Sequence, residues 1–117
     1  MNRNYLIEYR TIMNVINGSK SFYRFMKRDA IVLAYFYVDD FWNMDTTKKL
    51  LSVFEENNNG NINILLVDFY KKSNQSLVDS EDITNFPIIR LYKAGKMFQE
   101  IYITHSNIDE IVRSLMN

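Results

Sequence analysis

The chain has 117 residues, of which 47% are hydrophobic and 24% are charged, a composition typical of one ordinary globular domain and not of a disordered protein. Its 14 Lys and Arg residues balance its 14 Asp and Glu residues, and a net charge of zero argues against nucleic acid as the main partner. The absence of cysteine excludes disulfides and thiol chemistry, and a single histidine, His105, excludes a histidine-rich metal site.

Targeting and membrane signals are not evident in the sequence. No apolar run approaches the length that a bilayer-spanning helix needs. The first residues, MNRNYLIEYR, place charges on both sides of a short apolar island, which is unlike a secretory signal. We therefore expect a cytoplasmic protein with no membrane partner, no metal and no cofactor.

The first third of the chain predicts a strand, a helix and a second strand. Residues 11–16 (TIMNVI) have the composition of a short strand. From Ser19 to Asp29, apolar residues recur at helical spacing and basic residues follow in the last turn. Residues 30–38 (AIVLAYFYV) form a continuous apolar run, which is typical of a strand covered on both faces at the centre of a sheet.

The remaining elements alternate between helix and strand and end with a hairpin and a helix. They are a helix over 45–57, capped by Asp45 or, if it starts earlier, by Asp40; a strand over 61–70; a weakly amphipathic helix over 73–82; a hairpin over 86–104 that turns at Gly95; and a helix over 106–117. The predicted order is β-α-β-α-β-α-β-β-α, with residues 1–10 as an N-terminal extension and 11–117 as a single domain.

Three segments resemble the thioredoxin family. AIVLAYFYV is similar to the central strand that precedes the family's active site, ITNFPIIRLYKAGK to its cis-proline segment and following turn, and SNIDEIVRSL to its last helix. The resemblance implies an α/β fold, a three-layer α/β/α sandwich around a mixed sheet of four to five strands, and a cis bond between Phe86 and Pro87.

The resemblance also locates the segment that would correspond to the family's active site. Asp40, Phe41, Trp42 and Asn43 stand where the family has Cys-x-x-Cys, so both catalytic thiols are missing. The family's buried aspartate, which helps to move the proton of the second thiol, is replaced by Ala34. This fits the absence of the thiols, because a buried carboxylate with no thiol to serve would be an unpaired charge. The resemblance thus implies the fold without the disulfide reaction, and we expect no enzyme of that kind.

Several residues near this segment have a functional and a structural interpretation. Asp39 and Asp40 could form an acid/base pair or a hard-metal site, but adjacent side chains diverge at a strand end, which favours one solvated acid and one helix cap. Phe41 and Trp42 are large enough to anchor a protein interface, although one could fold onto the core. His105 is more typical of a surface residue than of a catalytic base.

Other aromatic residues fall within the predicted strands, and we expect them to pack in the core. These are Tyr35, Phe36, Tyr37, Phe69 and Tyr70.

Two functions of different classes remain open. The first is a redox-inactive module that binds a protein or an extended peptide through the former active-site face, formed by Asp40, Phe41, Trp42, Asn43, Asn85, Phe86, Pro87, Ile103 and Thr104. The second is a small-molecule or anion binder or enzyme of the glutathione-using type, in which a helix N-terminus holds the anion. Two carboxylates beside that site would repel an anion, which favours the first. We expect a monomer or weak dimer.

Overall fold

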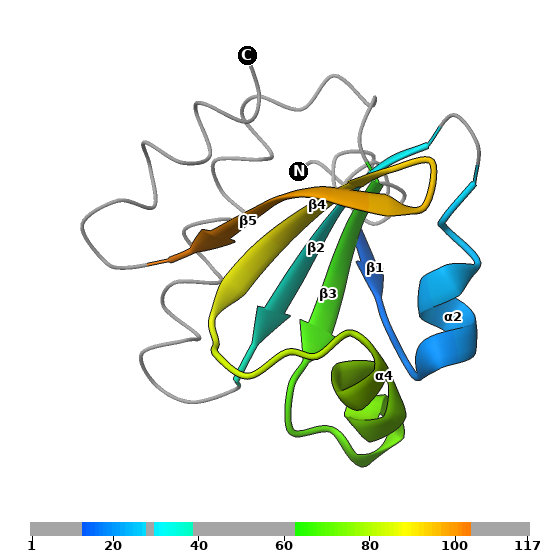
Figure 1. Ribbon diagram of the computed structural model, residues 1–117. Helices are drawn as coiled ribbons and strands as arrows, with labels where there is room; N and C mark the ends of the chain where they lie inside the picture. Colours follow the sequence, from blue (N-terminus) through cyan, green and yellow to red (C-terminus); the bar gives the residue numbers. More distant parts are fainter. Residues whose placement is uncertain (1–12, 28–29, 39–62, 104–117) are drawn as a thin grey trace, which may run out of the picture.

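The computed structural model describes residues 13–27, 30–38 and 63–103. Their elements are β1 (Met13–Val15), α2 (Ser19–Tyr23), β2 (Ile31–Tyr37), β3 (Asn63–Asp68), the 3-10 helix η1 (Lys72–Asn74), α4 (Gln75–Ser80), β4 (Ile88–Lys93) and β5 (Lys96–Tyr102). The five strands form one sheet in the order β1-β3-β2-β4-β5 (Figure 1).

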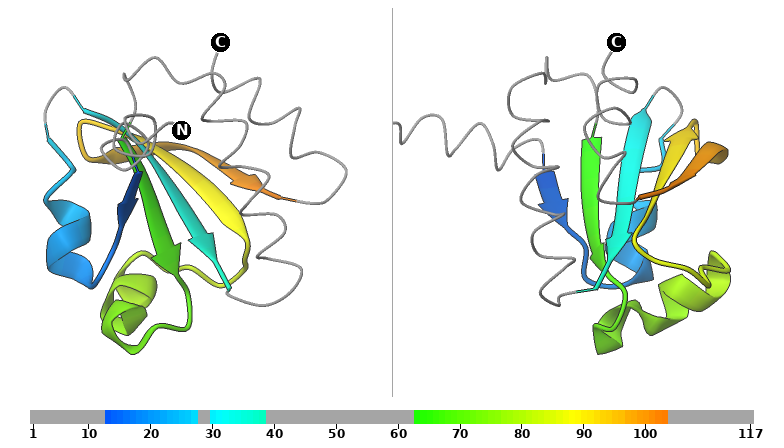
Figure 2. Two further views of the ribbon diagram at one scale, coloured as in Figure 1. Left: turned by 180° about the vertical axis from the view of Figure 1, so that it is seen from behind. Right: turned by 90° about the vertical axis from the view of Figure 1, so that its left-hand side faces the viewer.

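The sheet is mixed, as the sequence predicts. β1, β3 and β2 run parallel, whereas β4 is antiparallel to β2 and β5 is antiparallel to β4. Both views in Figure 2 show the strands side by side in this order, with β1 and β5 at the two edges of the described sheet. The α/β class and the central position of β2 are confirmed.

β2 lies at the centre because its side chains are apolar on both faces. Residues 32–36 are all buried, and the strand pairs with β3 on one side and with β4 on the other. A strand with polar residues on alternate positions could not occupy this place, because it would bury them without partners.

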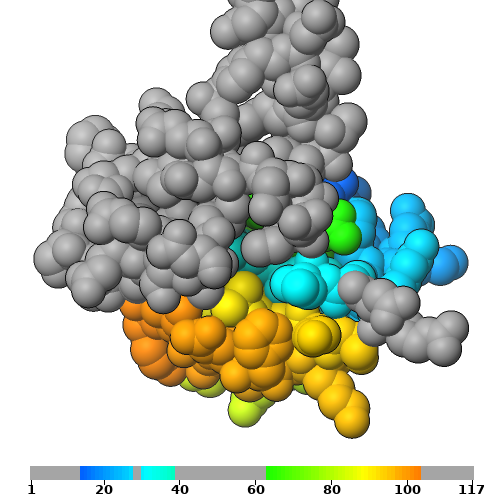
Figure 3. All heavy atoms as spheres, turned by 90° about the horizontal axis from the view of Figure 1, so that it is seen from above, coloured from blue at the N-terminus to red at the C-terminus, as the bar shows by residue number. Residues whose placement is uncertain are grey.

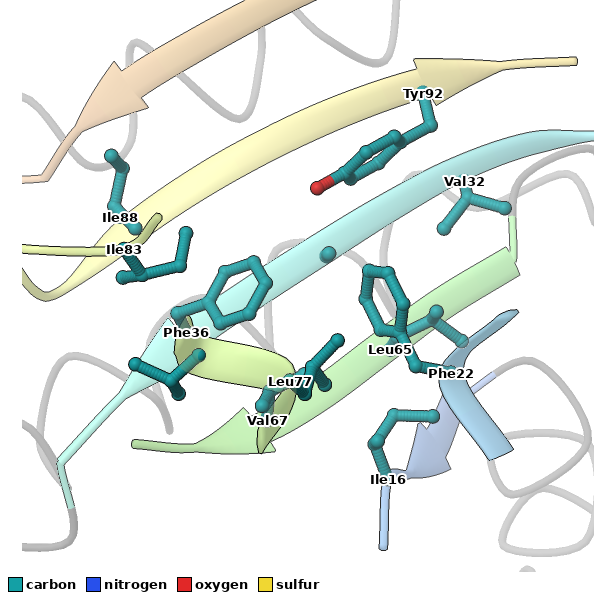
Figure 4. Packing of buried hydrophobic residues seen from close by; sticks show 12 residues of the cluster. Ile16, Phe22, Val32, Phe36, Leu65, Val67, Leu77, Ile83, Ile88 and Tyr92 are labelled. Atoms are coloured by element: carbon teal, nitrogen blue, oxygen red, sulfur yellow. The ribbon is translucent and has the colours of Figure 1, made fainter. Parts of the chain in front are cut away.

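One face of the sheet packs against α2 and α4 and forms the main described core. The core side chains come from three strands (β2, β3 and β4), both helices and the loops between elements (Figure 4): Ile16, Phe22, Val32, Ala34, Phe36, Leu65, Val67, Leu77, Val78, Ile83, Ile88 and Tyr92. The opposite face is also buried, at Leu33, Tyr35, Ile64 and Ile89. The helices predicted over 45–57 and 106–117 lie outside the described residues.

The helix predicted from Ser19 to Asp29 is shorter than expected. α2 ends at Tyr23, and the following amides of Phe25 and Met26 donate to the carbonyls of Phe22 and Tyr23 in tighter, three-residue turns. This ending lets the chain turn back toward β2 while Phe25 and Met26 still pack against the core. The sequence pattern reports the buried face correctly but not the point where regular helix stops.

The β4–β5 hairpin turns at Ala94 and Gly95, as predicted around Gly95. Both residues have positive φ angles, 55° and 81°, as a two-residue type I′ turn requires. Farther along, the register shifts between Leu91 and Tyr92, which leaves Phe98 in β5 without a partner residue on β4. No helix in the described parts of the chain is long and apolar enough to cross a membrane.

Candidate functional site

The segment Asn85–Pro87 joins the α4 region to β4. The peptide bond between Phe86 and Pro87 is cis. Pro87 is buried, and its carbonyl oxygen accepts a hydrogen bond of 3.3 Å from the backbone N–H of Ile103. The segment is therefore fixed to the end of β5, while the side chain of Asn85 remains exposed.

Three aromatic rings gather beside this segment. The ring of Phe86 lies 4.3 Å from that of Phe69 and 5.6 Å from that of Tyr70, measured between centroids. Phe69 and Tyr70 meet edge to face at 5.4 Å. Phe69 packs against the core, but Tyr70 is 65% exposed. We call Phe69, Tyr70, Asn85, Phe86 and Pro87 together the Pro87 site.

Hydrogen bonds hold the backbone around Tyr70 in place even though its ring is exposed. The N–H of Phe69 donates to the carbonyl of Tyr37 at 2.7 Å, and the N–H of Tyr70 donates to Oδ1 of Asp68 at 3.0 Å. The side-chain amide of Gln75 donates to the carbonyl of Phe69 at 2.9 Å. A large exposed ring on a fixed backbone is suited to contact a partner at small entropic cost.

The structure brings together only part of the set predicted from the sequence. Asn85, Phe86 and Pro87 lie at one place, and Ile103 is joined to them through its backbone, although its side chain is only 4% exposed. The other predicted site residues lie outside the described residues: Asp40, Phe41, Trp42, Asn43 and Thr104. Val38, the last described residue before Asp40, is buried.

Sequence reasoning missed Tyr70 as a site residue. Its assignment to the core is wrong, because β3 ends at Asp68 and the chain turns there, so that Tyr70 no longer alternates into the sheet. The assignment is correct for Tyr35 and Phe36, which are buried. The signal that could have identified Tyr70 is the run Tyr70-Lys71-Lys72, in which polar residues follow the aromatic ring at the end of an apolar strand.

The groups at the Pro87 site suit binding more than catalysis. Its described side chains are aromatic rings and an amide, and Lys71 and Lys72 beside Tyr70 are exposed. In the described parts of the chain, no three His, Asp or Glu side chains gather as metal ligands would. Stacking and hydrogen bonding to an extended chain are the chemistry that these groups offer.

A second polar cluster lies between β4 and α4 and is structural. Nε of Arg90 lies 2.6 Å from Oε2 of Glu100, and a terminal nitrogen of Arg90 lies 3.3 Å from Oε1 of Glu81. The hydroxyl of Tyr92 donates to the same Glu81 oxygen at 2.7 Å, and that of Tyr23 donates to its other oxygen. Arg90 is only 8% exposed, so these acceptors are what make its burial tolerable.

Burial is the main cause of a raised pKa at Tyr92, and the nearby Glu81 carboxylate adds to it, while Arg90 opposes it. Burial and the bond to Glu81 likewise raise the pKa of Tyr23. For Arg90, burial acts to lower the pKa, but the contacts with Tyr92 and Glu100 outweigh it and the pKa is raised. All three groups are thus held in their protonated forms, which is the state that the hydrogen bonds require.

Comparison with known proteins identifies the fold. No protein-family model and no curated protein matches the sequence. Among solved structures, thioredoxin f from spinach chloroplasts matches with a TM-score of 0.72 and 15% identity, over 95% of this chain and 94% of that one. The chain has a thioredoxin-like fold. It is also similar to oxidised thioredoxin from Plasmodium falciparum, with a TM-score of 0.70 and 15% identity over 90% and 99% of the two chains.

A thioredoxin mutant from Halobacterium salinarum agrees, with a TM-score of 0.65 and 18% identity over 90% and 91% of the two chains. These identities are low, so they support the fold alone. Within the thioredoxin-like fold, the cysteine-free sequence stands apart, because a chain without cysteine cannot carry a Cys-x-x-Cys motif.

Proposed function

We propose that this protein is a redox-inactive thioredoxin-like module that binds a protein or an extended peptide at the Pro87 site. The observation that carries the proposal is the position of Tyr70, which is 65% exposed on a hydrogen-bonded backbone and contacts Phe86 next to the cis peptide bond. An exposed ring of this size leaves apolar area in water that a partner could cover.

The loss of chemistry supports the same function. Disulfide exchange requires a thiolate as nucleophile, and the sequence has no cysteine. A thioredoxin-like fold without thiols still has the surface around the proline segment. An extended chain lying there could use backbone groups for affinity and the aromatic rings for selectivity. Residues Asp40, Phe41, Trp42, Asn43 and Thr104 belong to the proposed surface on the strength of the sequence resemblance.

Selection from a random linear peptide library on the full chain tests this proposal. The affinity of a selected peptide is then measured by fluorescence anisotropy for the wild type, for Tyr70→Ser and for Tyr102→Ser. Tyr102, in β5, is the matched control because it is also exposed, at 54%. We expect Tyr70→Ser to weaken binding by about tenfold or more and Tyr102→Ser to leave it unchanged.

Two results would contradict the proposal. One is a panel of selected peptides in which no peptide depends on Tyr70 for its affinity. The other is reduction of insulin in the presence of dithiothreitol above the blank, which would show that the chain supports disulfide exchange without its own thiols. A thermal shift caused by glutathione would favour the alternative of a small-molecule binder.

A further inference from the structure

We propose a second binding surface, separate from the Pro87 site, at which an extended acidic segment of another protein pairs with the β5 edge. The surface consists of the outer side of β5 with Met97 and Phe98, and of a basic end formed by Lys27, Lys93 and Lys96. In the view of Figure 3, β5 (orange) and the adjoining turn (yellow) lie side by side at the surface.

The fold brings together lysines that are far apart in the sequence. The N–H of Ala94 donates to the carbonyl of Ala30 at 3.2 Å, which ties the hairpin turn to the start of β2. A Cβ atom placed on Gly95 would lie 3.7 Å from Met26, the neighbour of Lys27. Lys27 therefore lies beside the turn that Lys93 and Lys96 flank, and all three side chains are exposed.

This basic end has no acidic counterpart among the described side chains. No ion pair joins these three lysines to a described carboxylate. The one acid of β5, Glu100, pairs with Arg90 at 2.6 Å and not with any of these lysines. In a chain of zero net charge, a local cluster of this kind is a specific feature, and a partner with matching negative charge would be attracted to it.

β5 also offers backbone hydrogen-bonding groups. Within the described sheet, β5 has a neighbouring strand on one side only, namely β4. The N–H of Ile103 points to β4, because it donates to Pro87. Since backbone direction alternates along an antiparallel pair, the N–H and C=O of Glu100 point away from β4. An extended segment can bond there as an added strand.

Exposed apolar side chains lie on the same strand. Met97 is 47% exposed and Phe98 is 57% exposed. The register shift leaves Phe98 without a partner residue on β4, and both residues follow directly after Lys96. The apolar contact and the basic end are therefore adjacent, so one short segment with apolar residues and a terminal run of acids could reach both.

An extended segment explains the lysine cluster, the open edge of β5 and the exposed apolar side chains better than other occupants do. An anionic bilayer would match the lysines and Phe98, but it would leave the edge of β5 unpaired. A second copy of this chain would bring a second set of the same lysines to the interface, where like charges repel. The extra residue in β5 also breaks the regular register that two copies of the strand would need in order to pair along their whole length.

The test uses the full chain and synthetic peptides of alternating valine and threonine that end in a run of aspartates. The aspartates stand at the C-terminal end for antiparallel pairing with β5 and at the N-terminal end for parallel pairing. Anisotropy measures the affinity for the wild type, for the double variant Lys93→Glu, Lys96→Glu and for the double variant Lys71→Glu, Lys72→Glu. The second pair is also exposed and changes the net charge equally, so it is the matched control.

We expect a peptide of one orientation to bind. The double variant Lys93→Glu, Lys96→Glu, called here the hairpin double variant, should weaken this binding by about tenfold or more, and the control double variant should have a much smaller effect. Phe98→Ser should also weaken binding, and the amide of Glu100 should become protected from hydrogen exchange in the complex. Tyr70→Ser should change nothing, which separates this surface from the Pro87 site.

Several outcomes would overturn the proposal. They are equal losses of affinity in the two lysine double variants, no binding of either peptide, no added protection of the Glu100 amide from hydrogen exchange, or loss of binding in Tyr70→Ser. Cosedimentation with phosphatidylcholine vesicles that contain phosphatidylserine, lost in the hairpin double variant, would assign the basic end to a membrane instead. Concentration-dependent dimerisation that Phe98→Ser abolishes would assign it to a second copy.

Discussion

The side-chain carbonyl oxygen of Asn74 accepts a hydrogen bond of 2.7 Å from the backbone N–H of Gly18, 56 residues earlier in the chain. The amide nitrogen of the same side chain donates to the carbonyls of Asp68 at 3.1 Å and of Ile16 at 3.5 Å. Asn74 stands at the N-cap of α4 but makes no capping bond, and it is fully buried. It thus joins the ends of β1 and β3 to the start of α4.

Asn74→Ala should lower the free energy of unfolding by about 2–3 kcal/mol, because it leaves buried backbone groups without partners. Urea denaturation with a common m-value measures the change. The matched control is Gln75→Ala, whose exposed side chain also donates to two backbone carbonyls, of Phe69 and Lys71. Water can replace those bonds, so the control should cost less than about 1 kcal/mol. Equal losses of unfolding free energy in the two variants would show that burial of the Asn74 hydrogen bonds is not the reason for their effect.

Asn74 also illustrates which features the sequence can predict. Residues 31–37 and the turn at Gly95 follow from local composition, because a continuous apolar run and a glycine turn impose their structure within a few residues. The thioredoxin-like fold follows from the order of such elements. The bonds of Asn74 do not, since an asparagine before a helix predicts a cap and its actual partners belong to distant segments.

The candidate site shows the same limit. The proline segment could be located from the sequence because Pro87 is the only proline of the chain and starts a strand. The apolar run alone does not locate Tyr70, because an aromatic residue at its end has the same composition whether the strand continues or turns, and only the two lysines that follow indicate a turn. The basic end at Lys27, Lys93 and Lys96 depends on a contact between the hairpin and the chain before β2, which no local pattern reports.

The hairpin turn provides a second prediction. Ala94 has a φ angle of 55°, a region that costs an L-residue with a Cβ about 1–2 kcal/mol, whereas asparagine followed by glycine is the preferred pair for this turn. Ala94→Asn should therefore raise the free energy of unfolding by about 0.5–1 kcal/mol and the melting temperature by a few degrees. Calorimetry measures both. Ala94→Val should have the opposite effect, and a stabilising valine would show that the backbone angle is not what matters.

The Arg90 cluster provides a third prediction. Arg90→Leu removes the cation from two carboxylates and should cost about 2–4 kcal/mol, less than a fully buried pair would, because Glu100 can reach water. Adding Glu81→Gln should recover part of this loss, since the amide oxygen still accepts from one tyrosine hydroxyl and the amide N–H can donate to the other, without an unpaired charge. Glu100→Gln alone should cost about 1 kcal/mol or less, because this side chain is 29% exposed. Denaturation of the four proteins at neutral pH compares them.

If the double variant were less stable than Arg90→Leu alone, an uncompensated Glu81 carboxylate could not be the cause of the loss. The cost would then come from packing of the arginine side chain against its neighbours. Arg90→Met separates these explanations further, because methionine retains most of the length of the side chain without its charge.

The last prediction concerns alkaline pH. Burial and the neighbouring Glu81 carboxylate raise the pKa of Tyr92 in the folded protein, so this hydroxyl keeps its proton where the unfolded chain releases it. Below about pH 10 both states are protonated and Tyr92 contributes no pH dependence. As the pH rises further, only the unfolded chain loses the proton, so the free energy of unfolding falls by about 1.4 kcal/mol per pH unit for this group.

Tyr92→Phe tests this linkage. At neutral pH the variant should be less stable by about 1 kcal/mol, because the hydrogen bond to Glu81 is lost. Above about pH 10 the wild type should lose stability faster than the variant, since phenylalanine has no proton to release, and the two curves should converge and then cross. Urea denaturation over a pH series measures both curves. Parallel curves throughout would show that Tyr92 ionises equally in the folded and unfolded states, and the proposed role of its burial would be wrong.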